Sequence, residues 1–225
     1  MEEVLDALID AYSGVLGPRL VGIAAHGSSV TGDFFPGVSD LDLAVILEDR
    51  LTLADSKTIA RRIDALSIEP FAYVQAMYHE AANPRPSLVP GAFRLLNGAV
   101  DEAFIHTERS LRSAATAWLE EVPALLDRDL KDWSVAVGRR PRQFRLLLTR
   151  LKPTVRAKLV RWGQDAVVTY SRPWPKLVEH LARRESNLAT KLSVLLTDMD
   201  APTLDPMILG AQVLDLLQGL AETRG

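Results

Sequence analysis

The apolar pattern of this chain changes near residue 107, and that change limits its fold more than any other feature. Up to residue 107, short apolar runs alternate with segments of helical spacing and with turns rich in Gly and Pro. Beyond it, every long segment has helical spacing. We therefore expect an α+β protein with two domains, residues 1–107 and residues 108–225. A chain of 225 residues is long enough for two small domains.

The first domain is expected to contain a small mixed sheet with flanking helices. Gly17-Pro18 predicts the end of the first helix, and three prolines between residues 83 and 91 predict a loop. The expected helices cover residues 3–16 and 53–66, and the expected strands cover residues 20–25, 41–47, 68–78 and 100–106.

The second domain is expected to be a helical bundle. Prolines divide its apolar pattern, because proline ends or kinks a helix. The expected helices cover residues 108–122, 141–162, 174–197 and 205–222, and Pro123, Pro153, Pro173 and Pro202 mark the expected breaks or kinks.

The composition is that of a globular protein and excludes several kinds of site. Hydrophobic residues make up 48% of the chain and charged residues 24%. The chain contains no cysteine, which excludes disulfides, thiolate metal sites and cysteine nucleophiles. The first residues, Met1-Glu2-Glu3, do not resemble a secretory signal, and no apolar run approaches the roughly 20 residues of a membrane span. We expect a cytoplasmic protein without membrane partners.

Charge is distributed unevenly between the two expected domains. Residues 1–109 contain 8 Lys/Arg and 16 Asp/Glu, whereas residues 110–225 contain 18 Lys/Arg and 13 Asp/Glu. This contrast supports a two-domain chain and is compatible with a cleft between the domains.

Asp40-Leu41-Asp42 is the first candidate for chemistry. Side chains alternate along a strand, so both carboxylates point to one face, with Cα atoms about 6.5–7 Å apart. Leu41 and the alternating apolar residues after Asp42 point to the core. Two carboxylates on one face form part of a site for a hard cation such as Mg²⁺.

A second candidate lies just upstream, where Gly27-Ser28 follows a buried strand. Small residues in such a turn allow a ligand to approach the backbone amides, which favour phosphate oxygens. The hydroxyl of Ser28 adds a further donor.

Together these residues resemble the signature of the polymerase-beta-type nucleotidyltransferase superfamily. That signature is Gly-Ser, a spacer of about ten residues and Asp-x-Asp on a strand; the spacer here is residues 29–39. The two-domain organisation resembles aminoglycoside nucleotidyltransferases in particular.

The resemblance implies a magnesium-dependent enzyme with a nucleoside triphosphate, most simply ATP, as co-substrate. Asp40 and Asp42 would hold Mg²⁺, while Gly27 and Ser28 would hold the terminal phosphates. A hydroxyl of a small molecule, plausibly an aminoglycoside, would attack the α-phosphorus and release pyrophosphate. Ser39 is close enough to the aspartates in sequence to contact a phosphate.

Members of this family usually add a third carboxylate from a neighbouring strand, as a metal ligand or a general base. Glu69 is the candidate because it opens the expected strand over residues 68–78. Asp64 and Glu80 are the alternatives. His26 precedes Gly27, and we interpret it as a packing residue, although a base at this position is the alternative.

The second domain contains a basic stretch. No acidic residue occurs between Asp132 and Asp165, where nine Lys or Arg residues are found. Some nucleotidyltransferases of this type use a cation from the helical domain, and Lys158 and Lys152 are the candidates for nucleotide binding here.

Two other functions remain open from the sequence. The basic stretch could follow a nucleic-acid backbone, as in toxin-like nucleotidyltransferases that act on tRNA or on protein. The chain could also be a nucleotide-binding module without catalysis. A monomer and a homodimer are both compatible with the sequence.

Overall fold

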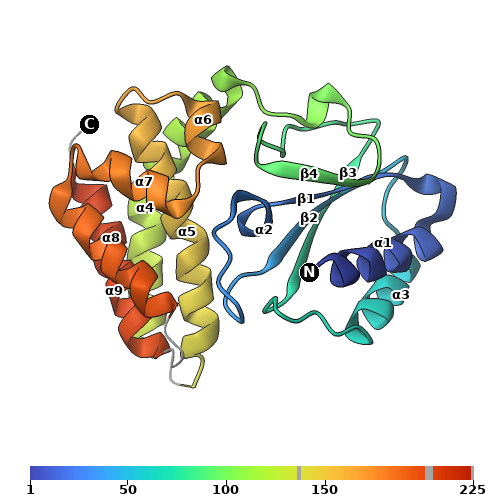
Figure 1. Cartoon of the computed structure of the whole chain (residues 1–225), viewed down its shortest axis with the longest axis horizontal. Helices are drawn as coiled ribbons and strands as arrows, with labels where there is room; N and C mark the ends of the chain where they lie inside the picture. The colour runs from blue at the N-terminus through green and yellow to red at the C-terminus, as the bar shows by residue number, and fades with distance from the viewer. Residues whose placement is uncertain (136–137, 201–204, 224–225) are drawn as a thin grey trace. The chain divides into compact units, whose positions relative to one another are not determined.

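The computed structural model describes residues 1–135, 138–200 and 205–223, in two compact units. The first unit comprises Met1–His106 and the second begins at Thr107. Figure 1 shows an α+β fold, with a sheet and its helices in the first unit and helices in the second. Each unit is described separately below.

The first unit is built on a mixed four-stranded sheet. The strand order is β3-β2-β1-β4; β2 and β3 are parallel, and the other neighbours are antiparallel. Its elements are α1 (Glu2–Leu16), η1 (Gly17–Arg19), β1 (Leu20–His26), α2 (Ser28–Thr31), β2 (Leu41–Leu47), α3 (Leu53–Asp64), β3 (Val74–Glu80), β4 (Phe93–Gly98) and η2 (Glu102–Phe104).

The two faces of this sheet are covered differently. On one face, Leu41, Leu43, Val45 and Leu47 of β2 pack with apolar residues of α1 and α3, as their alternation predicts. Figure 1 shows α1 and α3 together on this face. On the other face, a smaller apolar cluster contains Ala24 and Ala44 together with Leu88. The amino-terminal part of β2 on this second face therefore carries polar residues.

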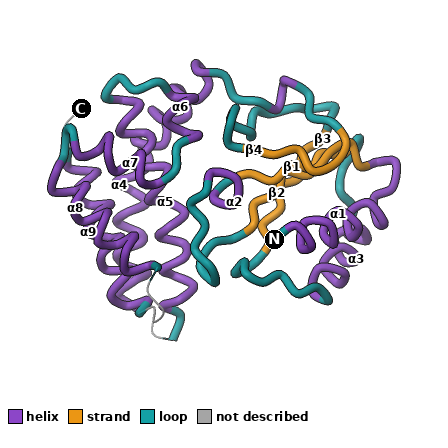
Figure 2. The backbone as a smooth tube through the Cα atoms, in the orientation of Figure 1, coloured by secondary structure: helices purple, strands orange, loops and turns teal. Residues whose placement is uncertain are grey.

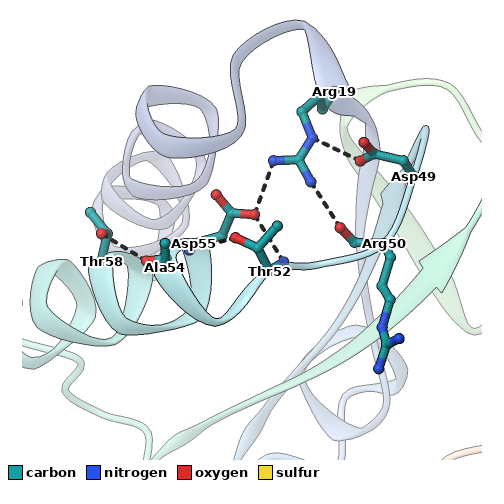
Figure 3. A network of polar contacts seen from close by, with 7 residues as sticks. All are labelled: Arg19, Asp49, Arg50, Thr52, Ala54, Asp55 and Thr58. Atoms are coloured by element: carbon teal, nitrogen blue, oxygen red, sulfur yellow. Dashed lines mark hydrogen bonds and ion pairs between the residues drawn. The ribbon is translucent and has the colours of Figure 1, made fainter.

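A polar network joins the end of β2 to the start of α3 (Figure 3). Arg19 donates to the carboxylates of Asp49, at 2.7 Å, and Asp55, at 2.9 Å, and to the backbone carbonyl of Arg50, at 2.9 Å. Thr52 and Asp55 form a reciprocal capping box at the first turn of α3. The network lies at the end of β2 opposite Asp42, so it supports the fold at a distance from the candidate site.

Two strands lie at other positions than the sequence predicts. Residues 100–106, expected to form the last strand, contain η2, and only Ile105 makes an isolated bridge, to Leu88. The fourth strand is β4, an edge strand whose side chains are exposed or half-buried, so its apolar signal is weak. The third strand begins at Val74 instead of residue 68.

The second unit contains six helices in its described residues. Figure 2 shows these helices in purple, and α4, α5 and α9 pack against one another. They are α4 (Glu108–Val135), α5 (Arg140–Arg161), α6 (Ala166–Ser171), α7 (Trp174–Ala182), α8 (Ser186–Met199) and α9 (Pro206–Glu222).

The expected breaks in this unit are only partly correct. Pro123 lies inside α4, which continues past it, so the helix expected over residues 108–122 is too short. Pro153 lies inside α5, which extends through it as the helix expected over residues 141–162 does. An internal proline costs a helix about 3 kcal/mol, and the buried apolar residues on both sides of each proline offset that cost. Pro173 does mark a boundary, as the N-cap of α7, whereas Pro202 lies outside the described residues. The single helix expected over residues 174–197 is two helices, and α6 was not expected.

Over the described ranges, no helix combines the length and the apolar character that crossing a membrane requires.

Candidate active site

Asp42 and Gly27 are in contact in the folded chain. Antiparallel pairing places His26, the last residue of β1, opposite Asp42 on β2, and Gly27 follows at a positive φ of 73°. A Cβ atom at Gly27 would overlap the Oδ2 atom of Asp42. Glycine is therefore required here twice, by its backbone conformation and by the carboxylate beside it.

The turn after Gly27 forms the short helix α2. The carbonyl of Gly27 accepts hydrogen bonds from the amides of Val30, at 3.2 Å, and Thr31, at 3.1 Å. The amides of the first residues of a helix have no partner within that helix. The hydroxyl of Ser28 is buried and has no hydrogen-bond partner in the described part of the chain. The turn therefore contains polar groups beside Asp42 that lack hydrogen-bond partners within the turn itself.

Asp40 and Asp42 flank a fully buried Leu41, and both are half-buried. Because Leu41 faces the helix-covered core, alternation directs both aspartates to the opposite face of the sheet. Ser39 stabilises the loop before them, since its hydroxyl accepts a hydrogen bond from the Phe35 amide at 3.0 Å. Its carbonyl accepts another, from the Ala72 amide at 2.9 Å.

Glu69 does not lie on the strand beside Asp42. It is an exposed residue of the turn before β3. The parallel register of β2 and β3 places Gln75 opposite Asp42. Among the alternatives, Asp64 is the last residue of α3, and Glu80 lies opposite Leu47 at the other end of β2. Gln75, with an exposed carboxamide side chain, is therefore the residue beside Asp42 on β3. It was not among the site residues predicted from the sequence.

The aspartates fit a magnesium ion that is shared with a bound nucleotide. Within the described residues, no group of three or more His, Cys, Asp or Glu side chains could hold a metal ion by itself. Mg²⁺ usually binds one or two carboxylates together with substrate phosphates and water. Two carboxylates on one face, beside a glycine turn with an unpaired hydroxyl, supply that kind of incomplete site.

His26 on β1 lies opposite Asp42 on β2. Burial lowers the pKa of its imidazole to about 4, and the nearby His79 adds to this effect, while Asp40 opposes it. His26 is therefore uncharged at neutral pH and does not neutralise the aspartates. Its Nε2 atom is buried and has no hydrogen-bond partner in the described chain.

The two candidate lysines both lie on α5 of the helical unit. Lys158 is 4% exposed, and its Nζ donates to the carbonyl of Thr223 at 2.8 Å. Burial lowers the pKa of Lys158, and the neighbouring Arg161 lowers it further. The Nζ of Lys152 lies 5.4 Å from the centre of the Trp174 ring. Both cations therefore contact other parts of the helical unit.

Comparisons with known proteins found a matching family model and a similar solved structure. A family model of the nucleotidyltransferase domain matches residues 2–73. Among solved structures, the fold is similar to that of spectinomycin adenyltransferase AAD(9) from Enterococcus faecialis, determined with ATP and spectinomycin. That match has a TM-score of 0.60 and 11% sequence identity, and it covers 97% of this chain and 99% of the other. No curated protein matches the sequence.

Residues 2–73, which contain both the Gly-Ser turn and the aspartate pair, are therefore assigned to a nucleotidyltransferase domain. The complete fold, a mixed sheet followed by a helical region, is similar to that of the spectinomycin adenyltransferase.

Proposed function

We propose that this protein transfers a nucleoside monophosphate from a nucleoside triphosphate, most simply ATP, to a hydroxyl group of a small molecule. The observation that carries the proposal is the contact between the Asp42 carboxylate and Gly27. It joins the two halves of the signature in one site, with a carboxylate for the metal beside a turn for the phosphates.

Each residue of the site has a defined part in this reaction. Asp40 and Asp42 would hold Mg²⁺, and Gly27 and Ser28 would hold the terminal phosphates of the nucleotide. A bound Mg²⁺ offsets the charge of the triphosphate and of the attacking oxygen. The acceptor oxygen forms a bond to the α-phosphorus, and the bond from this phosphorus to the bridging oxygen breaks. Pyrophosphate leaves with the electron pair, and the hydroxyl proton passes to solvent or to a base.

An aminoglycoside is the acceptor that we propose. The structurally similar AAD(9) was determined with ATP and spectinomycin, and the first 109 residues of this chain carry twice as many acidic as basic residues. An acidic surface attracts a polycationic acceptor. Glu69 as third carboxylate and base, Ser39 as phosphate contact, and Lys152 and Lys158 as nucleotide contacts stay predictions of the sequence.

The test is pyrophosphate release with each of the four common nucleoside triphosphates and Mg²⁺, against a panel of aminoglycosides that includes spectinomycin, and against bulk tRNA. We expect release that requires an aminoglycoside and is lost on omission of Mg²⁺ and in Asp40→Asn. Release with tRNA alone would instead support the toxin-like function. Nucleotide binding without release in any mixture would contradict an aminoglycoside transferase.

A further inference from the structure

Three polar residues form one row across the sheet on the face that carries the aspartates. His26 on β1 lies opposite Asp42 on β2, and Asp42 lies opposite Gln75 on β3. Ala25, the neighbour of His26, packs in the core on the helix-covered face. Alternation therefore directs the imidazole of His26 to the face of Asp42.

The polar groups on both sides of Gly27 lack partners. Nε2 of His26, before the glycine, and Oγ of Ser28, after it, are buried without a hydrogen bond in the described residues. Buried polar atoms nearly always have a partner, and leaving one unpaired costs free energy. A ligand at Gly27 would supply partners for both atoms. Other buried polar atoms in the described residues also lack partners, but these two flank one glycine that itself contacts a carboxylate, so together they form a candidate ligand site.

An unpaired imidazole alone would not support this interpretation, because His79 on β3 also has a buried, unpaired Nε2. His79 lies opposite Ile46, four residues beyond Asp42, and its ring packs edge-on against Phe104 with 5.8 Å between centroids. It has no glycine turn beside it. His79 is therefore a packing histidine on the same face of the sheet, and it serves as a matched control for His26.

We propose that His26 is a nucleotide-contacting residue of this site, which donates a hydrogen bond from Nε2 to an oxygen of the bound triphosphate. The inference rests on the proposed nucleotide site. An imidazole N–H is a hydrogen-bond donor, and a phosphate oxygen accepts such a bond.

Calorimetric titration of the full chain with ATP in the presence of Mg²⁺ tests the proposal. Replacement of the imidazole by a ring without a donor, His26→Phe, is expected to weaken ATP binding about tenfold. His26→Gln keeps an N–H donor and is expected to lose less than His26→Phe. His79→Phe is expected to bind ATP as the wild type does.

Nitrogen-15 NMR of histidine-labelled wild-type protein provides a measurement that does not depend on a folded variant. On addition of ATP and Mg²⁺, the Nε2 resonance of His26 should shift as a hydrogen-bonded donor, while that of His79 should stay in place. Wild-type affinity in a folded His26→Phe variant, or an unchanged His26 resonance in the ATP complex, overturns the inference and leaves the proposed function standing. Absence of ATP binding to the wild type overturns both.

Discussion

Both units of this protein contain buried polar groups, and the surroundings of those groups differ. In the helical unit, two of these groups lie close to partners on another helix, although others, such as the hydroxyl of Thr169, have no hydrogen bond in the described residues. Asp129 is fully buried, and its Oδ2 lies 2.6 Å from Nε of Arg150; this contact is an ion pair by distance, although its geometry does not qualify as a hydrogen bond. Trp118 donates to the hydroxyl of Thr154 at 2.9 Å. These groups connect one helix to another.

In the first unit, the polar atoms around Gly27 are buried without such partners. The hydroxyl of Ser28 and Nε2 of His26 both lack a hydrogen bond in the described residues, and His26 lies opposite Asp42 on the neighbouring strand. Unpaired buried groups cost free energy, and a ligand at Gly27 would offset that cost for these two atoms. The two units thus differ in where these groups lie: the unpaired atoms flank the glycine beside Asp42, whereas the paired groups join two helices.

The largest effect that we expect is on catalysis, from Asp42→Asn. Loss of one metal-binding carboxylate should lower kcat/KM by at least about a thousandfold. Circular dichroism should show an intact fold, because the substitution keeps the shape of the side chain. The matched control is Asp10→Asn on the exposed surface of α1, which should leave turnover unchanged. Substantial turnover by Asp42→Asn would contradict the proposed role of Asp42 as a metal ligand.

The largest expected effect on stability comes from the helical unit. Asp129→Ala leaves Arg150 as an unpaired and nearly buried cation, with 11% of its side chain exposed. Breaking a buried ion pair in this way costs about 3–5 kcal/mol in free energy of unfolding. Denaturant unfolding measures this loss. The double variant Asp129→Leu/Arg150→Met should regain much of it, and no gain from the second substitution would show that the pair is not the cause.

Lys158→Met tests two roles of Lys158. The sequence predicts that it binds the nucleotide, and in the structure it donates a hydrogen bond to Thr223 within the helical unit. Removal of the ammonium leaves the carbonyl of Thr223 without this donor, so we expect a loss of about 1–2 kcal/mol in free energy of unfolding. Titration of the variant with ATP tests whether Lys158 also binds the nucleotide. A weaker ATP affinity, beyond that of a Lys191→Met control on α8, would give this lysine the nucleotide role that the sequence predicted.

The smallest effect concerns acid stability in the network of Figure 3. Hydrogen bonds from Thr52, followed by that from Arg19, lower the pKa of Asp55 from 3.8 to about 2. A carboxyl whose pKa is lower in the folded state stabilises the fold above its unfolded pKa. That contribution is lost as pH falls from about 4 through about 2. Thermal unfolding should show a smaller acid-induced loss in Asp55→Asn than in the wild type, and identical pH dependence would contradict the network's role.

The site was predicted in part from the sequence because half of it is local. Gly27-Ser28 follows a buried strand, and Asp40 and Asp42 alternate with Leu41, so residue types and spacing are enough to suggest the chemistry. The boundaries of β2 were correct because its apolar residues, interrupted only by Asp42, extend from Leu41 to Leu47 and are followed by polar residues. Edge strand β4 was missed because its half-exposed side chains give no clear pattern.

Side-chain alternation and turn chemistry act between near neighbours, so the class of fold, the pair of aspartates and the glycine turn could be predicted from the sequence. Which residues flank Asp42 depends on the pairing of strands in the folded chain. Strand pairing brings together residues far apart in the chain, so His26 and Gln75 lie beside Asp42, while Glu69 remains in a turn. Register between β2 and β3 depends on the packing of both strands against α1 and α3, which no local pattern encodes.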